Sequence, residues 1–313
     1  MKKHFLSASY LACCCLALSS VGCVQRVPLP ERRETFDPKP EVAVSPKDKI
    51  NSNNAPDEVT DAIPDADPSD QKSGLDTAFL QDALTKAQKL AIADQLFLYE
   101  GGGLRVNLVA WNSGENFPSL GIAHFIWMPA AAVAEKARFG ESFPRMLRFL
   151  VNHKVRLIPF LAKLSPSFTC PWTQKSDIAS IEAEELRTFL DENRDYQVDY
   201  AIHNFVSLSQ EILLSAPTLR DQVLSRMKSV AKSRTGVYPL IDYINFKGSG
   251  LGNQTWGLKQ VLLEMKGDGP EEFGAAADRI LTQRTENFPD DRKFLVGWRQ
   301  RVRSYSQFSM PGR

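Results

Sequence analysis

One glutamate in the sequence, Glu100, stands directly before three glycines and at the end of a segment in which apolar residues recur at helical spacing. At a helix C-terminus the backbone dipole opposes a negative charge, and the apolar neighbours Phe97 and Leu98 exclude water. Both effects favour the neutral carboxyl. A glutamic acid that keeps its proton near neutral pH is what a glycosidase needs to protonate its leaving oxygen. The alternative is a plain surface charge, because many helices end in Glu-Gly.

The residues after Glu100 strengthen the catalytic interpretation. A polar turn leads to Ser119-Leu120-Gly121-Ile122-Ala123-His124. This order resembles the bacteriophage lysozyme family, in which the catalytic glutamate ends a helix before a small β-sheet with a Thr-hydrophobic-Gly-hydrophobic-Gly-His run. Residues 243–248 and 255–262, and more weakly 284–286, resemble later segments of that family in the same order. The resemblance covers roughly residues 90–287 and implies a lysozyme-like domain that acts on peptidoglycan.

The resemblance also assigns roles to single residues. Glu100 matches the general acid, and Ser119 falls where the family has a threonine that positions the attacking water. His124 matches a histidine of the family that is mainly structural. Independently, a lone histidine among apolar residues is usually a hydrogen-bonded core residue. Asn245 is expected to hydrogen-bond the substrate or the region of Glu100, or else to cap the loop over residues 247–253. The aspartate expected in the turn after the first strand is replaced by Asn112, which cannot act as a base or nucleophile.

Two mechanisms follow from this replacement, because Glu115 is the only acid in the turn. If Glu115 faces Glu100, a two-carboxylate hydrolase results, and a separation of about 5 Å or about 6.5 to 9.5 Å would indicate retention or inversion. If Glu115 faces solvent, Glu100 acts alone, first as acid and then as base, with assistance from the acetamido group of the substrate. That second mechanism resembles the lytic transglycosylases. We favour it, because Asn112 occupies the expected position.

Other residues suggest binding roles with competing structural explanations. Trp111 could stack on a sugar ring, as could Tyr99, Trp127 and Trp256, although aromatic residues at strand and helix spacing more often belong to the core. The basic cluster Arg299, Arg301 and Arg303 is expected to form a solvated face, with contact to anionic glycan or lipid as the alternative. Cys170 lies beside a proline and is expected to be packed rather than reactive. No spacing of His and Cys residues suggests a metal site, and no cofactor is expected.

The elements that must position these residues are mostly helices. A helix with Asp76 or Thr77 as its cap is expected to end at the glycines after Glu100. Residues 106–111 and 119–127 are rich in β-branched and aromatic types, and the Asn-Ser-Gly turn between them predicts a hairpin. Further helices are predicted over 143–149, 181–189, 200–214, 219–230, 240–246, 256–265 and 273–281. The expected fold is therefore α+β and predominantly α-helical, a lysozyme-like domain with a small hairpin or sheet after the catalytic helix.

The first residues have the pattern of an export signal. A positive start and an apolar run over residues 5–18 lead to small residues and Cys23. The ending Ser20-Val21-Gly22-Cys23 resembles a bacterial lipoprotein signal, in which the cysteine is acylated, although leucine is usual where Ser20 stands. The alternative is a signal cleaved nearby without lipidation. No aspartate follows Cys23, which favours an outer-membrane lipoprotein that faces the periplasm.

The chain divides into three regions: a signal peptide over residues 1–22, a disordered tether over 23–75 that is rich in Pro and Asp, and a helical domain over 76–313. A formal net charge of +1 on 313 residues excludes the basic excess typical of nucleic-acid binding. The sequence predicts a monomeric periplasmic glycosidase, a muramidase or lytic transglycosylase, with peptidoglycan strands as its partner and the membrane reached through the lipid anchor. The alternative is a non-catalytic wall-binding or assembly lipoprotein on a degenerate lysozyme-like scaffold.

Overall fold

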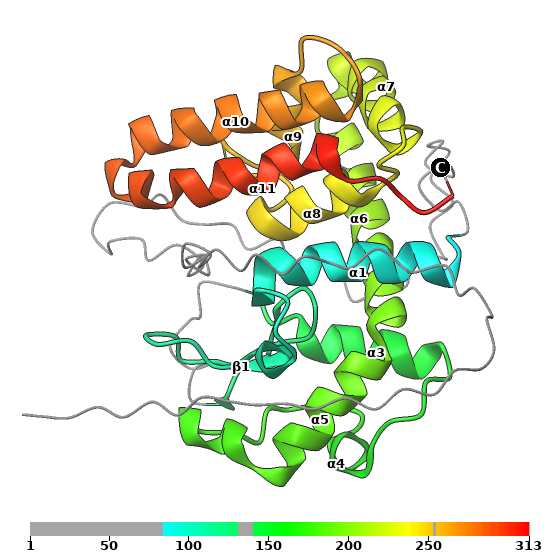
Figure 1. Cartoon of the computed structure of the whole chain (residues 1–313), viewed down its shortest axis with the longest axis vertical. Coiled ribbons are helices and arrows are strands. Elements are labelled where there is room, and N and C mark those ends of the chain that lie inside the picture. Colours follow the sequence, from blue (N-terminus) through cyan, green and yellow to red (C-terminus); the bar gives the residue numbers. More distant parts are fainter. Residues whose placement is uncertain (1–83, 131–139, 253–254, 313) are drawn as a thin grey trace, which may run out of the picture. The chain divides into compact units, whose positions relative to one another are not determined.

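The computed structural model describes residues 84–130, 140–252 and 255–312 (Figure 1). All of them fall within residues 41–313, the second of two units into which the chain divides. The expected signal peptide, the lipidation site Cys23 and the tether lie outside the described residues. Within the described ranges, no helix is both long enough and apolar enough to cross a membrane.

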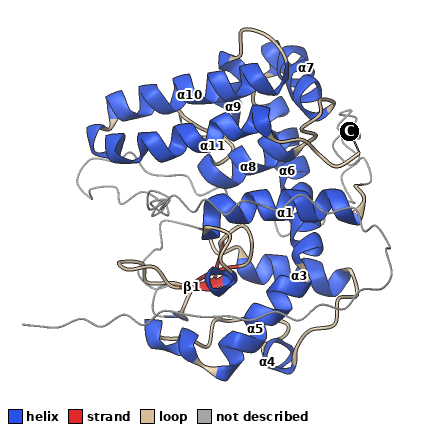
Figure 2. Ribbon diagram, in the orientation of Figure 1, coloured by secondary structure: helices blue, strands red, loops and turns tan. Residues whose placement is uncertain are grey.

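The described residues are predominantly helical with one small antiparallel sheet, which confirms the coarse fold class (Figure 2). The α-helices are α1 (Lys86–Gly101), α3 (Phe143–Asn152), α4 (Pro159–Lys163), α5 (Ile181–Glu192), α6 (Arg194–Leu214), α7 (Arg220–Ala231), α8 (Tyr238–Lys247), α9 (Leu258–Glu264), α10 (Gly269–Asn287) and α11 (Leu295–Gln307). Short 3-10 helices are η3 (Arg105–Leu108), η4 (Lys175–Ala179), η5 (Pro217–Leu219) and η6 (Pro289–Phe294).

Helix α1 positions Glu100. It begins at Lys86 with Thr85 as its cap, whose Oγ1 accepts from the backbone N–H of Gln88 at 3.3 Å while Gln88 Oε1 accepts from the Thr85 N–H at 3.0 Å. Asp76 and Thr77, the expected caps, lie outside the described residues. The helix ends as predicted at the glycines, with Gly102 in the left-handed conformation at φ 64°. Glu100 therefore lies in the last turn.

The small sheet follows, in the order β1 (Val109–Ala110), β2 (Ser119–Leu120) and β3 (Phe125–Ile126). Both pairings are antiparallel, and Ser119 pairs with Ala110 on one side and Ile126 on the other. The predicted strands were too long: residues 105–108 form η3 instead. A tight turn splits the second predicted strand into β2 and β3, with Gly121 at φ 72° and His124 at φ 51°. The left-handed conformation is uncommon for a residue other than glycine, although histidine tolerates it better than most.

Gly121 allows this turn to approach α6 closely. A Cβ at Gly121 would lie 2.2 Å from the side-chain oxygen of Gln197. That oxygen accepts from the backbone N–H of Ile122 at 3.0 Å, and the amide nitrogen of Gln197 donates to Leu190 O at 2.6 Å. Gln197 is fully buried, so its polar atoms need these partners. Helix α6 thus anchors the turn that carries His124.

Helix α11 was not predicted from the sequence, although it packs along α10 and also contacts α8 (Figure 1). Its sequence is largely polar and carries three arginines, which concealed its amphipathic pattern. The buried residues of α11 are Trp298, Arg301, Val302, Ser304 and Tyr305, and all of them except Ser304 have the i, i+3, i+4, i+7 spacing of a helix face. The helical spacing of buried residues along α11 is complete only if Arg301 is counted among them.

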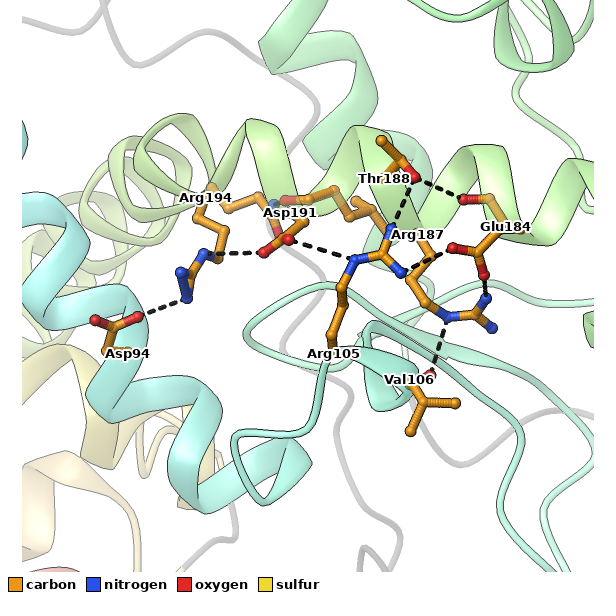
Figure 3. A network of polar contacts seen from close by, with 10 residues as sticks. Asp94, Arg105, Val106, Glu184, Arg187, Thr188, Asp191 and Arg194 are labelled. Carbon is orange, nitrogen blue, oxygen red and sulfur yellow. Dashed lines mark hydrogen bonds and ion pairs between the residues drawn. The ribbon is translucent and has the colours of Figure 1, made fainter. Parts of the chain in front are cut away.

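A network of charged side chains fastens η3, the segment after the α1 glycines, to helix α5 (Figure 3). Arg105 donates to Glu184 Oε1 and Thr188 Oγ1, each at 2.8 Å, and pairs with Asp191 at 3.4 Å. Arg187, which pairs with Glu184, donates from Nε to Val106 O at 3.2 Å. Arg194 extends the network to α1 by pairing with Asp191 and Asp94. The chain on both sides of Glu100 is therefore tied to neighbouring helices.

Candidate active site

Glu100 is held by side chains from distant parts of the sequence. Its Oε1 accepts from Arg301 Nη2 at 2.6 Å and from Asn245 Nδ2 at 3.1 Å. Its Oε2 lies 3.8 Å from His124 Nδ1. The Glu100 side chain is only 12% exposed. Three of the residues proposed from the sequence, Glu100, His124 and Asn245, thus come together.

Asn245 connects two of the elements around Glu100. It lies on α8, and the same Nδ2 that donates to Glu100 also donates, at 3.4 Å, to the backbone oxygen of Ala123 in the β2–β3 turn. Of the roles expected for Asn245, contact with the Glu100 region is confirmed, and contact with a substrate remains a prediction. The amide joins the end of α1 to the turn that carries His124.

Arg301 was expected on a solvated face, and that prediction was wrong. Its side chain is 5% exposed and pairs with both Glu100 and Asp242. The guanidinium lies 4.2 Å from the ring centroid of Phe246, so it is also covered by an aromatic face. Burial alone would lower the pKa of Arg301, but the charges of Asp242 and Glu100 outweigh burial and raise the pKa well above its usual value. Arg301 is therefore a permanent cation beside Glu100.

This cation changes the expected environment of Glu100. Helix α1 has no basic residue in its last turn, so no residue of its own compensates the unfavourable dipole there. Arg301 supplies that compensation from α11 instead. A guanidinium at hydrogen-bond distance favours the ionised carboxylate, whereas the helix end and the apolar neighbours favour the neutral acid. The two kinds of effect therefore act on the Glu100 carboxyl in opposite directions.

Asp242 is the second carboxylate of the site and has no solvent exposure. Its Oδ2 accepts from Arg301 Nε at 2.8 Å, and its Oδ1 accepts from Arg301 Nη2 at 2.9 Å, in a two-pronged pair. Tyr305 donates its hydroxyl to Oδ2 at 2.7 Å. Burial and then the negative charge of Asp242 raise the pKa of Tyr305 well above its usual value, so the phenol stays protonated and remains a donor.

Asp242, Arg301 and Tyr305 were missed by sequence reasoning, but each left a signal. Asp242 interrupts the otherwise apolar run of α8, three positions before Asn245 and hence on the same helix face. Arg301 and Tyr305 occupy core positions of α11, four residues apart. A buried charge requires a partner of opposite charge. An acid on the buried face of one helix and a base on the buried face of another are therefore expected to pair.

Ser119 is placed in the central strand of the sheet and is buried. It pairs with Ala110 of β1 and with Ile126 of β3. Its proposed role in positioning a water remains a prediction.

Asn112 and Glu115 interact with each other within the turn after β1. Asn112 Nδ2 donates to Glu115 Oε2 at 3.1 Å, and the backbone oxygen of Glu115 accepts from Trp111 Nε1 at 2.9 Å. The Trp111 ring is buried, and its proposed stacking on a sugar remains a prediction. These contacts give Asn112, Glu115 and Trp111 a role in shaping the turn.

The other aromatic candidates are also occupied by protein contacts. Trp127 is fully buried, donates to Phe168 O at 2.7 Å and packs on Phe143 and Trp172. The Trp256 ring has the guanidinium of Arg284 at 4.0 Å from its centroid. Both tryptophans therefore pack against other protein groups, as expected if they are structural residues.

Cys170 is buried, as expected, and the Sγ contacts Trp172 O at 3.7 Å. Among the residues that the structure describes, no group of His, Cys, Asp or Glu side chains could hold a metal ion. The carboxyl of Glu100 can accept or donate a proton, and Arg301 and Asn245 set its orientation. Searches against protein-family models, curated proteins and solved structures find no match to the chain.

Proposed function

We propose that the protein is a peptidoglycan-cleaving glycosidase in which Glu100 is the general acid. Its substrate would be the β-1,4 bond between N-acetylmuramic acid and N-acetylglucosamine. The observation that carries the proposal is the placement of Glu100: a mostly buried carboxyl at a helix end, held through Oε1 by Arg301 and Asn245. A carboxyl held in one orientation can protonate a leaving oxygen without first losing rotational freedom.

A single-glutamate mechanism fits the turn better than a pair of carboxylates. Asn112 stands where the lysozyme resemblance places an aspartate, and Glu115 accepts a hydrogen bond from that asparagine. In the proposed reaction, Glu100 donates its proton to the glycosidic oxygen as the bond to C1 of the muramic acid breaks. The acetamido oxygen of the same sugar stabilises C1. Glu100 then removes a proton from the attacking hydroxyl, either water or the sugar's own 6-hydroxyl.

The lipoprotein-like signal before Cys23 supports a location of this activity in the bacterial cell envelope. Acylation of Cys23 would anchor the protein in the outer membrane, and residues 23–75 would let a monomeric domain reach glycan strands in the periplasm. Mass analysis of the mature N-terminus tests the anchor: acyl groups on Cys23 support it, and an unmodified terminus at another residue contradicts it.

A second candidate function is a non-catalytic wall-binding or assembly protein on the same scaffold. The pairing of Glu100 with Arg301 favours this alternative, because a buried ion pair can serve to orient α1 and α11 without chemistry. In that case the carboxylate would be a structural partner only.

Zymography on peptidoglycan separates these candidates. Wild-type protein is compared with Glu100→Gln, which keeps an oxygen to accept from Arg301 and Asn245 but has no acidic proton. We expect clearing by the wild type and none by Glu100→Gln, with both proteins equally folded by circular dichroism. Equal clearing by both would exclude Glu100 as the acid, and no clearing by either over a range of pH would favour the binding protein. Mass spectrometry of the products then distinguishes an anhydromuramyl end from a reducing end, which differ by one water.

A further inference from the structure

The β2–β3 turn near Glu100 has a backbone shape that needs support from outside the turn. Gly121 and His124 both lie in the left-handed region, with φ of 72° and 51°. For a residue other than glycine this conformation is unfavourable, and it persists only where the surrounding contacts impose it. The hydrogen bond inside the turn, from the N–H of His124 to Gly121 O, is long at 3.4 Å. Contacts with neighbouring elements must therefore hold the turn in place.

Two hydrogen bonds from neighbouring elements hold the start of the turn. The N–H of Gly121 donates to the backbone oxygen of Leu108 in η3 at 2.8 Å. The N–H of Ile122 donates to Oε1 of Gln197 in α6 at 3.0 Å. The first acceptor is a backbone group, which any residue would supply. The second acceptor is a side chain, so this support depends on the identity of residue 197.

Gln197 is itself fixed by the junction between α5 and α6. Its Nε2 donates to the backbone oxygens of Leu190 at 2.6 Å and of Asn193 at 3.2 Å. The side chain is fully buried, so these protein groups, rather than water, satisfy its amide. Near the same junction, Asp191 pairs with Arg194 at 3.4 Å in the network of charged side chains (Figure 3). The amide of Gln197 thus ties the position of the turn to that of the junction.

Asn245 connects the same turn to Glu100. Its Nδ2 donates to Ala123 O at 3.4 Å and to Glu100 Oε1 at 3.1 Å. Ala123 directly follows Ile122, the residue that Gln197 holds, so α6 and α8 hold adjacent residues of the turn. The bond to Ala123 O is near the upper limit of a hydrogen bond, and a small shift of the turn would break it. The Asn245 amide would then lose one of the two acceptors that set its direction.

We propose that Gln197 is a positioning residue for Glu100: it fixes the β2–β3 turn, and the turn fixes the Asn245 amide that donates to the carboxyl. Both side chains of this relay are neutral amides, so they set geometry without adding a charge beside Glu100. A shift of a reacting group by about 1 Å can lower a rate about a hundredfold, even when the altered residue is remote from the chemistry. The kinetic consequence rests on the proposed function, whereas the link from Gln197 to Asn245 does not.

Hydrogen exchange of the Asn245 side-chain amide tests the link without any substrate. The full chain is labelled with nitrogen-15, and the amide signals are assigned by their loss in Asn245→Ala. Gln197→Met nearly keeps the volume of the side chain but offers Ile122 only a weak acceptor. We expect the Asn245 amide protons to exchange with water at least about fivefold faster in Gln197→Met, the factor that corresponds to one net hydrogen bond. An unchanged exchange rate would overturn the proposal.

Ile212→Ala is the matched control for a loss of stability. Ile212 is also fully buried and lies on the same helix, α6. It is 15 residues beyond Gln197, which is about 22 Å along the helix axis. Its truncation removes core packing and destabilises the fold, but it should leave the exchange of the Asn245 amide at the wild-type rate. Equal acceleration in Gln197→Met and Ile212→Ala would mean that exchange follows overall stability, which refutes the link.

The kinetic consequence gives a separate readout. If the wild type cleaves peptidoglycan, Gln197→Met should lower kcat by roughly ten- to a hundredfold with little change in KM, because no binding group is removed. Ile212→Ala should keep the wild-type kcat at temperatures where it is folded. In Asn245→Ala the relay is already broken, so adding Gln197→Met should lower kcat much less than it does in the wild type. Equal losses in both backgrounds would contradict a relay through Asn245.

The two readouts separate this proposal from the proposed function. Faster exchange of the Asn245 amide without a loss of kcat would show that Gln197 does not position Glu100 for the reaction. A wild type that cleaves no peptidoglycan would contradict the proposed function, and the exchange rates would still decide whether Gln197 controls the Asn245 amide.

A second variant covers the case in which Gln197→Met does not fold. In Gly121→Ala the added carbon would meet Gln197 Oε1 at 2.2 Å, so it disturbs the same contact from the side of the turn. This variant should also accelerate exchange of the Asn245 amide and lower kcat. Its control is Gly269→Ala, which changes another left-handed glycine, at φ 86°, where the added carbon meets Glu271 Oε2 at an ordinary 3.6 Å. Equal effects of the two alanines would assign the result to the backbone and not to Gln197.

Discussion

Arg301 and Glu100 lie 201 positions apart in the sequence, yet Nη2 of Arg301 donates to Oε1 of Glu100 at 2.6 Å. The contact joins α11, the last helix described, to the end of α1. It places a buried cation beside the carboxyl that the sequence favours as a general acid. Asp242 and Asn245, both on α8, complete the arrangement from a third helix.

The first prediction concerns the stability that this buried ion pair contributes. Replacing Arg301 by Met should lower the free energy of unfolding by about 3 to 5 kcal/mol, because it leaves Asp242 as a buried charge with no cation. The double variant Arg301→Met/Asp242→Asn should lose less than the sum of the two single variants, since neither charge is then stranded. Urea unfolding of the four proteins measures this coupling. Strict additivity would mean that the two side chains do not stabilise one another.

The second prediction concerns the turn that carries His124. Gly121→Ala should destabilise the protein by more than Gly102→Ala, although both glycines have a left-handed backbone, with φ of 72° and 64°. An alanine at Gly102 meets no atom within 4 Å, so it costs only the backbone penalty, about 1 to 2 kcal/mol. At Gly121 the added carbon meets Gln197 Oε1 at 2.2 Å, so either the buried amide loses its hydrogen bond to Ile122 or the turn shifts, at a further cost of about 1 to 3 kcal/mol. Chemical denaturation of the two variants measures the difference, and equal losses would refute the steric argument.

The third prediction compares the contributions of Glu100 and Glu115 to the proposed activity. In a turbidity assay on cell walls, Glu115→Gln should retain most of the wild-type rate, because its partner Asn112 can still form a hydrogen bond to the amide oxygen. Glu100→Gln should lose at least about a hundredfold, the usual contribution of a general acid. A loss of similar size in Glu115→Gln, with its fold intact, would point to a two-carboxylate mechanism instead.

The fourth prediction uses Cys170 as a probe of burial and pH. Burial is the main cause that raises the pKa of this thiol, from 9.0 to about 12. The thiol should therefore resist alkylation by iodoacetamide in the native protein at pH 8 and react after unfolding. Rapid alkylation of the folded protein would show that the loop around Cys170 opens.

The same shift links Cys170 to stability at high pH. Because the folded-state pKa is the higher one, the contribution is fully present below about pH 9 and is lost as the pH rises towards about 12. Buried tyrosines with raised pKa values act in the same direction, so the comparison must be with Cys170→Ser. The wild type should lose more unfolding free energy between pH 8 and pH 10 than this variant does. Identical losses would contradict the link to Cys170.

Local patterns were sufficient to predict the elements that carry Glu100 and the residues that follow it. The end of α1 was predicted because a run of glycines terminates a helix, and α3 and α5 to α10 were predicted from apolar periodicity. The sheet was predicted from its β-branched and aromatic residues, but its length was overestimated, since the Gly121 turn and η3 depend on contacts with α6 and α5. The start of α1 depends on a capping box at Thr85.

The sequence by itself determined a helical domain with a small sheet and a glutamate at a helix end, because turn and helix signals act over a few residues. Only the tertiary structure decided what surrounds that glutamate. Asp242, Asn245 and Arg301 converge on it because buried polar groups must find partners, and the partners are chosen by packing between α1, α8 and α11 rather than by neighbours in the chain. The surface arginine expected from composition thus proved to be the buried cation beside Glu100, since only packing determines which face of α11 is covered.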